Sequence, residues 1–142
     1  MSDPYALADA DPVSAVLAWL EQHPKVVEAL GGPGRVSGID EAPWPHVKVT
    51  HGPGGDMGRL EWATTPEVML EVLGDPGGWP GKAELRRMAL VCAVAAKELP
   101  DMDPQPPGPV ISGVRPSGLL IWSPLATGQP RWLLGLLVAL HP

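Results

Sequence analysis

Two histidines and an aspartate, His46, His51 and Asp56, are the residues of this chain whose types could hold a metal ion. Imidazole and carboxylate groups are ordinary zinc ligands. On a regular strand, however, a spacing of five places the rings of His46 and His51 on opposite faces. A turn at His51 could bring the rings together, but no second cluster of ligands supports such a site. We therefore interpret both as surface histidines of a strand and a loop, and we predict no metal and no cofactor.

The segment Gly52–Gly58 contains four glycines among its seven residues, together with Pro53 and Asp56, and this composition resembles a phosphate-binding loop. Such a loop follows a strand and opens a helix, usually with Lys-Ser or Lys-Thr at the helix start. Here Arg59–Trp62 follows, and its pattern begins no helix. The segment is therefore predicted to be a flexible loop between strands.

The remaining reactive groups lack the neighbours that chemistry needs. Cys92 falls on the apolar stripe of a predicted helix, where cysteine behaves as a small hydrophobe rather than as an exposed nucleophile. Glu67 and Glu71 share a strand face without a partner motif, and we interpret them as solvated charges. No Gly-x-Ser-x-Gly nucleophile elbow occurs. The sequence therefore predicts no catalytic residue and a protein that is not an enzyme.

Size and composition favour one domain that spans residues 1–142, with residues 1–10 as a flexible N-terminal segment. The hydrophobic content of 44% is enough for a core, and the net charge of −6 disfavours nonspecific binding to DNA or anionic lipid. A single cysteine favours a reducing compartment, and Met1–Pro4 does not begin a secretory signal. The apolar C-terminal run is too short for a membrane span.

The hydrophobic pattern predicts an α+β fold, with a single mixed or antiparallel β-sheet and two helices packed on one face. Asp11 and Pro12 start the first helix, which runs to residue 30 in two pieces and ends at Gly31. The second helix covers 82–99 and ends before Pro100. Strands are expected, in chain order, over 35–39, 46–50, 67–73, 110–114, 119–122 and 131–141.

The terminal strand is apolar on both of its faces. Its even positions from 132 to 140 are Trp, Leu, Leu, Val and Leu, and its odd positions from 133 to 139 are Leu, Gly, Leu and Ala. Both faces must then be covered, either by the protein's own helices or by another subunit. Tryptophans in or beside loops, Trp44, Trp62 and Trp79, also favour contacts with other chains, since Trp is enriched at interfaces.

The turn between the last two strands carries a family resemblance. Trp122-Ser-Pro, followed by Gly128-Gln-Pro and Arg131-Trp, resembles the tail terminator (tail completion) proteins of long-tailed bacteriophages, the siphoviruses, especially those of GC-rich actinobacterial hosts. The order of elements over residues 11–142 is similar as well. The chain departs from the family's pattern at Leu125, where an aspartate is common.

The resemblance implies a structural virion protein without cofactors. Family members form a homo-oligomeric ring, expected to be a hexamer, that caps the tail tube, ends its polymerisation and contacts the head-tail connector or stopper protein. DNA would pass through the lumen without specific binding. The location would be the neck-proximal end of the virion tail, with assembly in the host cytoplasm. The expected interface residues, on loops and aromatics, are Trp44, Pro53, Asp56, Trp62, Trp79, Trp122 and Arg131.

Two other functions stay open at this point. A head-completion or stopper protein of the neck has the same size range. A small cytoplasmic module that binds one specific protein would use its apolar strand for docking. Both alternatives are non-enzymatic, and neither needs a metal or a membrane.

Overall fold

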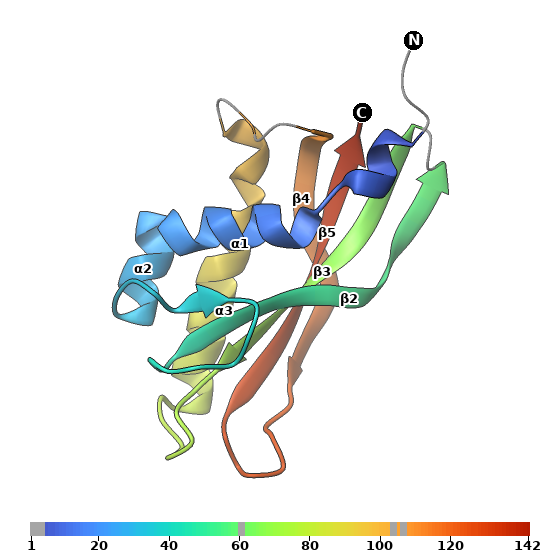
Figure 1. Cartoon of the computed structure of the whole chain (residues 1–142). Coiled ribbons are helices and arrows are strands. Elements are labelled where there is room, and N and C mark those ends of the chain that lie inside the picture. The colour runs from blue at the N-terminus through green and yellow to red at the C-terminus, as the bar shows by residue number, and fades with distance from the viewer. Residues whose placement is uncertain (1–4, 60–61, 103–104, 106–107) are drawn as a thin grey trace.

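A computed structural model describes residues 5–59, 62–102, 105 and 108–142 of the chain. One mixed five-stranded sheet, in the order β1-β2-β3-β5-β4, carries the α-helices on one face (Figure 1). The helices are α1 (Pro12–Gln22), α2 (Pro24–Leu30) and α3 (Lys82–Lys97); the strands are β1 (Val36–Ser37), β2 (His46–Arg59), β3 (Ala63–Leu73), β4 (Val110–Trp122) and β5 (Arg131–His141). The predicted α+β class is confirmed, and the first predicted helix accounts for both α1 and α2.

Local capping explains where the first two helices begin and end. The Asp11 carboxylate accepts a hydrogen bond from the Ser14 backbone N–H at 3.0 Å, and Pro12 occupies the first turn. Pro24 starts α2, and His23 caps it by accepting from the Lys25 N–H at 3.2 Å. Gly31 ends α2 with a φ of 90°, a left-handed conformation that favours glycine.

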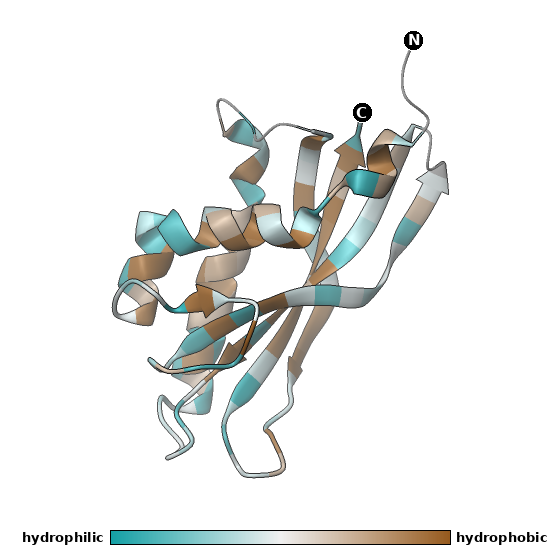
Figure 2. Ribbon diagram, viewed as in Figure 1, coloured by the Kyte–Doolittle hydropathy of each residue, from teal (hydrophilic) through white to brown (hydrophobic). Residues whose placement is uncertain are grey.

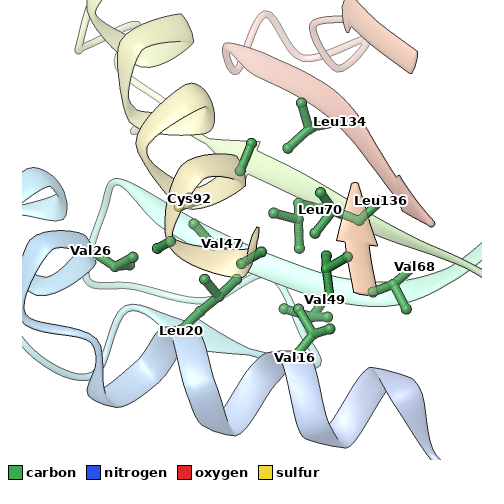
Figure 3. Close-up of a cluster of buried hydrophobic side chains, with 14 of the residues drawn as sticks. Val16, Leu20, Val26, Val47, Val49, Val68, Leu70, Cys92, Leu134 and Leu136 are labelled. Carbon is green, nitrogen blue, oxygen red and sulfur yellow. The ribbon is translucent and has the colours of Figure 1, made fainter. Parts of the chain in front are cut away.

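The core lies between the helices and the sheet. Val16 and Leu20 of α1 and Val26 of α2 converge with Cys92 of α3 on the central strands (Figure 3). Trp19 joins α1 to α3, because its indole N–H donates to the Ala95 carbonyl at 2.7 Å. Every residue of the predicted buried stripe is buried: Leu85, Met88, Ala89, Cys92 and Ala96 lie in α3, and Leu99 lies in the short 3-10 helix that follows it. Brown hydrophobic bands recur along β4 and β5 in Figure 2.

Three strands are longer than the sequence predicts, and one of them is β3, which begins at Ala63 rather than at residue 67. The glycine-rich segment 52–56, predicted as a loop, belongs to β2, where Gly55 pairs with Pro66 and Asp56 with Thr65 of β3. Register shifts between His51 and Gly55 show that the strand bulges at the glycines. Likewise, the two predicted strands 110–114 and 119–122 form one strand, β4, with a register shift between Pro116 and Leu120. The loop prediction was therefore wrong at 52–56, whereas the predicted loop at 74–81 is confirmed.

Both ends of the described chain lie near the end of β2 and the start of β3 (Figure 1). Residues 6–9, which were expected in a flexible segment, form the 3-10 helix η1 (Ala6–Asp9) and bury Leu7. The predicted connector over 100–109 begins with a second 3-10 helix, η2 (Leu99–Asp101), and four of its residues, 103–104 and 106–107, lie outside the described part. Within the described residues, no helix is long and apolar enough to cross a membrane.

The interpretation of His46 as a surface residue was wrong, because its side chain is fully buried. Its Nε2 lies 2.7 Å from the Ser37 hydroxyl of β1, and its ring packs edge-on against Trp44 at 6.3 Å between centroids. Burial lowers the pKa of His46 below its ordinary value, more than the nearby Glu41 carboxylate raises it.

This lowered pKa predicts a loss of stability in mild acid. Below about pH 6.5 the unfolded chain protonates His46 while the folded state still resists protonation. The free energy of unfolding should therefore fall as the pH decreases from about 6.5 toward the lower pKa of the folded state. Above about pH 6.5, His46 should add no pH dependence to this free energy. Chemical denaturation at pH 7.5 and 5.5 measures the difference, and His46→Gln should show a smaller drop. An equal drop in the variant would assign the pH dependence to other groups.

Candidate protein interface

The face of the sheet opposite the helices, here called the open face, is the candidate interface. Its side chains alternate with the buried core residues along each strand and are aligned by the strand register. They include Lys48, Thr50, Glu67, Met69, Glu71, Arg115, Ile121, Leu133, Gly135, Leu137 and Ala139. No helix among the described residues packs on this face (Figure 1).

An apolar strip runs along the open face and consists of Ile121, Leu133, Leu137 and Ala139. Ile121 of β4 pairs with Leu133 of β5, and its side chain is 50% exposed. The three β5 members are half-buried. The two apolar faces of β5 therefore differ in environment: the even face meets the helices, whereas the odd face meets none of them. Exposed aliphatic side chains grouped on a sheet are typical of a surface that binds another protein.

A network of charges lies next to this strip. The Glu71 carboxylate of β3 is only 8% exposed, yet Arg131 donates to its Oε1 at 2.9 Å and the Lys48 ammonium lies 3.5 Å from its Oε2. Arg131 also donates to the carbonyl and hydroxyl of Ser123, at 2.8 and 3.1 Å. Because two cations compensate its charge, Glu71 is stable in a buried position.

Glu67 is buried to the same degree on the same face, with 7% exposure, but it has a different environment. Its Oε1 accepts a hydrogen bond from the Gly54 N–H at 3.0 Å, and no ion pair reaches it from the described residues. Our interpretation of Glu67 and Glu71 as solvated charges was therefore wrong for both. Both residues are largely buried, Glu71 beside two cations and Glu67 without a cation among the described residues.

Three glycines make room for the Glu67 side chain. A Cβ added at Gly52 would lie 2.6 Å from Glu67 Cγ, and one at Gly54 would lie 3.0 Å from Oε1. On the other side, a Cβ at Gly135 would lie 2.3 Å from Glu67 Oε2 and 2.2 Å from the Ser117 hydroxyl. Because these glycines of β2 and β5 have no side chain, the Glu67 side chain can occupy the space next to them.

A hollow of about 400 Å³ opens beside Glu67 on the open face. It is lined by Glu67, Asp56, Thr65, Arg115, Ser117 and Leu137, with backbone from Gly54 and Gly55. Glu67, Leu137 and Arg115 lie in one row across three strands, since Leu137 pairs with both of the others. The hollow therefore has an apolar floor, a carboxylate on one side and an exposed guanidinium on the other.

The seven residues expected at an interface fall into separate parts of the molecule. Pro53, Asp56 and Trp62 lie on the β2–β3 hairpin, all of them exposed, with Trp62 at 70%. Asp56 also lines the hollow beside Glu67 and accepts from the Gly58 N–H at 2.8 Å. At the opposite end of the sheet, Trp79 is 54% exposed in the loop after β3.

The other three expected residues already have partners within the chain. Trp44 is half-buried against His46, and its carbonyl accepts from Arg35. The Trp122 ring packs against Trp132, with 5.5 Å between centroids, and the Lys82 ammonium lies 5.4 Å from the Trp122 centroid. Arg131 belongs to the Glu71 network. These residues stabilise the fold, in addition to whatever contact they make with another chain.

Sequence reasoning missed the residues that give the open face its character: Glu67, Arg115, Ile121 and Leu137. The alternation of Ile121 with Leu120 and Trp122 was available as a signal, but the sequence does not show which face the helices cover. The pairing of Glu67 and Arg115 with Leu137 depends on the strand order, which joins residues far apart in the chain.

Other parts of the described chain offer less for chemistry. No group of three or more metal-ligating side chains occurs among the described residues. Burial raises the pKa of the Cys92 thiol to about 12, so the thiolate that would act as a nucleophile does not form near neutral pH. A hollow of about 700 Å³ near the start of α1 is mostly apolar, and Asp11 and Gln105 on its wall already hold hydrogen bonds to Ser14 and Ile111.

No protein-family model matches this chain, and no curated protein is similar enough to it to count as a match.

Proposed function

We propose that this protein is a structural subunit of a bacteriophage tail, a tail terminator that forms a ring on the last ring of the tail tube. The ring, expected to be a hexamer, would end tube polymerisation and contact the head-side connector or stopper. In the virion it would lie at the neck-proximal end of the tail. The resemblance at Trp122–Trp132 suggests this function.

The observation that supports the proposal most is the open face. The odd side of β5 and the half-exposed Ile121 form an apolar strip that no described helix covers. Exposure of such a strip to water is unfavourable in a monomer. In a subunit of an assembly the strip is favourable, because a neighbouring copy can bury it. The long strand β4 lies at the edge of the described sheet, and a ring contact would protect this edge from indiscriminate pairing.

The net charge of −6 also suits the proposal. A lumen lined by an acidic protein repels the phosphate backbone, so DNA can pass without sticking. The function therefore needs neither a DNA-binding surface nor a cofactor.

Light scattering tests the function directly. We expect the purified protein, alone or after addition of purified tail-tube protein, to reach a mass well above that of one chain and to block further tube growth. A protein that stays monomeric in both conditions and does not bind tube ends contradicts the proposal. Binding to a neck connector without binding to tube ends would instead favour a stopper protein.

Ile121→Asp tests whether the open face is the surface that assembles. The variant should fold normally, since its side chain is half-exposed, but its self-association or tube binding should weaken by at least about tenfold, because a buried charge disrupts an apolar contact. Ile39→Asp is the matched control, because Ile39 is similarly exposed, at 57%, in the loop before β2. Equal assembly by both variants would place the interface elsewhere.

A further inference from the structure

Glu67 lacks the compensation that Glu71 has, although the two differ by four positions on one strand face. Arg131 and Lys48 pair with Glu71, whereas Glu67 accepts a single backbone N–H and has no cationic partner among the described residues. The side chain of Glu67 also lines the hollow on the open face, so its carboxylate can be reached from outside the chain. The three glycines around Glu67 leave room for its side chain, and a cation from another molecule could pair with it there.

The hollow beside Glu67 has room for such a cation. Its volume of about 400 Å³ is large enough for a long basic side chain, and its floor, Leu137, would pack against the aliphatic part of that side chain. Glu67 and Asp56 both line the hollow, against the single Arg115 on the far wall, so the charges of the lining side chains are negative in sum. A guanidinium fits best, because its planar donors match a carboxylate.

A free arginine with apolar neighbours occurs on the outer side of α3. Arg87, Leu90, Val91 and Val94 line a shallow groove there, and Val94 is 63% exposed. No ion pair holds Arg87 within the described part of the chain. The nearest acidic wall residue, Glu98, is occupied by His23, whose Nε2 lies 2.8 Å from it. The outer side of α3 is therefore an apolar surface that carries the positive charge of Arg87.

We propose that copies of this chain join head to tail, with the outer side of α3 of one copy packed on the open face of the next. Arg87 then enters the hollow and pairs with Glu67, while Leu90 and Val94 cover Leu137, Leu133 and Ile121. The proposal rests on the ring proposed above, since it names the contact between neighbouring ring subunits. The two surfaces lie on different sides of one chain, so the contact is heterologous, as a ring requires.

The residues proposed to meet are separated by similar distances on the two surfaces. From Arg87 to Val94, seven helical residues span about 10 Å, at about 1.5 Å per residue. From Leu137 to Leu133, four strand residues span about 13 Å, at about 3.3 Å per residue. With Arg87 beside Glu67, Val94 therefore falls close to the row of Leu133 and Ile121.

A disulfide cross-link tests this placement. A Val94→Cys/Ile121→Cys variant, assembled alone at high concentration or on tail-tube ends and then oxidised, should give a ladder of covalent multimers on a non-reducing gel. Each single-cysteine variant can give a dimer at most. The native Cys92 does not interfere, because it is fully buried.

Charge variants test the Arg87–Glu67 pair. Arg87→Gln and Glu67→Gln should each weaken association at least about 30-fold, and the double variant should be no weaker than the worse single variant, since both remove one pair. Arg86→Gln is the control, because Arg86 is exposed on α3 but does not line the groove; it should associate as the wild type does.

The outcomes separate this contact from the function. Assembled protein that gives no ladder, or additive effects of the two Gln substitutions, overturns the α3 contact and leaves the ring standing. A ladder without tube-end binding supports the contact and overturns the tail-terminator function. Absence of any assembly, alone and on tubes, overturns both.

Discussion

Leu136→Asp is expected to leave almost no folded protein at 25 °C. Leu136 is fully buried in β5, between Val68 of β3 and Pro116 of β4, and faces the helices. Loss of a buried leucine side chain costs about 2–5 kcal/mol, and an unpaired buried carboxylate adds several more. The sum approaches or exceeds the roughly 5–15 kcal/mol by which a domain is stable. Circular dichroism and the yield of soluble protein measure the effect.

Two variants make the Leu136 result specific. Leu136→Ala removes the side chain without adding charge, so it should lower the free energy of unfolding by about 2–5 kcal/mol and leave a folded protein. Ile121→Asp introduces the same carboxylate on the open face of β4 and should keep a denaturation midpoint close to that of the wild type. A cooperative transition in Leu136→Asp at the wild-type midpoint would show that the helix-facing side of β5 is assigned wrongly.

Elements whose determinants are local could be predicted from the sequence. Asp11, Pro12 and Pro24 act within one helical turn, and Gly31 ends α2 through its own backbone conformation. The buried stripe of α3 follows from helical periodicity alone. The final hairpin was also predictable, because two apolar strands flank a turn that contains Gly128 and Pro130.

Features that depend on distant residues could not be predicted. The glycines at 52–55 resemble a loop because glycine usually marks one, but here two of them make room for Glu67, which lies more than ten positions away on the paired strand. The burial of His46 is likewise a consequence of contacts with Ser37 and Trp44 that the strand pattern does not encode. Secondary-structure propensity describes only a residue's own backbone. The strand at 52–55 and the burial of His46 depend instead on tertiary packing.

The candidate interface shows the same division. The sequence alone shows that both faces of β5 are apolar, and it predicts that both must be covered. The sequence does not say which face the helices take, so the exposed partner Ile121 and the charged row of Glu67 and Arg115 emerge only from the strand order. Aromatic residues in loops were predicted as contacts, yet Trp44 and Trp122 each have a ring partner within the chain.

Gly135→Val is expected to destabilise the protein although valine is one of the best strand formers. Replacing a strand glycine normally gains about 0.5–1 kcal/mol through the backbone entropy of the unfolded chain. At Gly135, however, the new Cβ would lie 2.2 Å from the Ser117 hydroxyl, 2.3 Å from Glu67 Oε2 and 3.1 Å from the Leu119 Cβ. Overpacking of this kind costs about 1–3 kcal/mol, and the two further methyl groups place the cost at the upper end. A net loss of about 2 kcal/mol should appear in chemical denaturation.

Two comparisons assign that loss to the space that Glu67 needs. Gly113→Val, on the neighbouring strand, should be neutral or stabilising, because a Cβ there would meet only the Ala139 Cβ, at an ordinary 3.9 Å. In a Glu67→Ala/Ser117→Ala background the two closest atoms are gone, so Gly135→Val should cost little or raise stability. If the valine costs the same in both backgrounds, the strain comes from the β5 backbone, and the glycine serves the strand itself rather than the buried carboxylate.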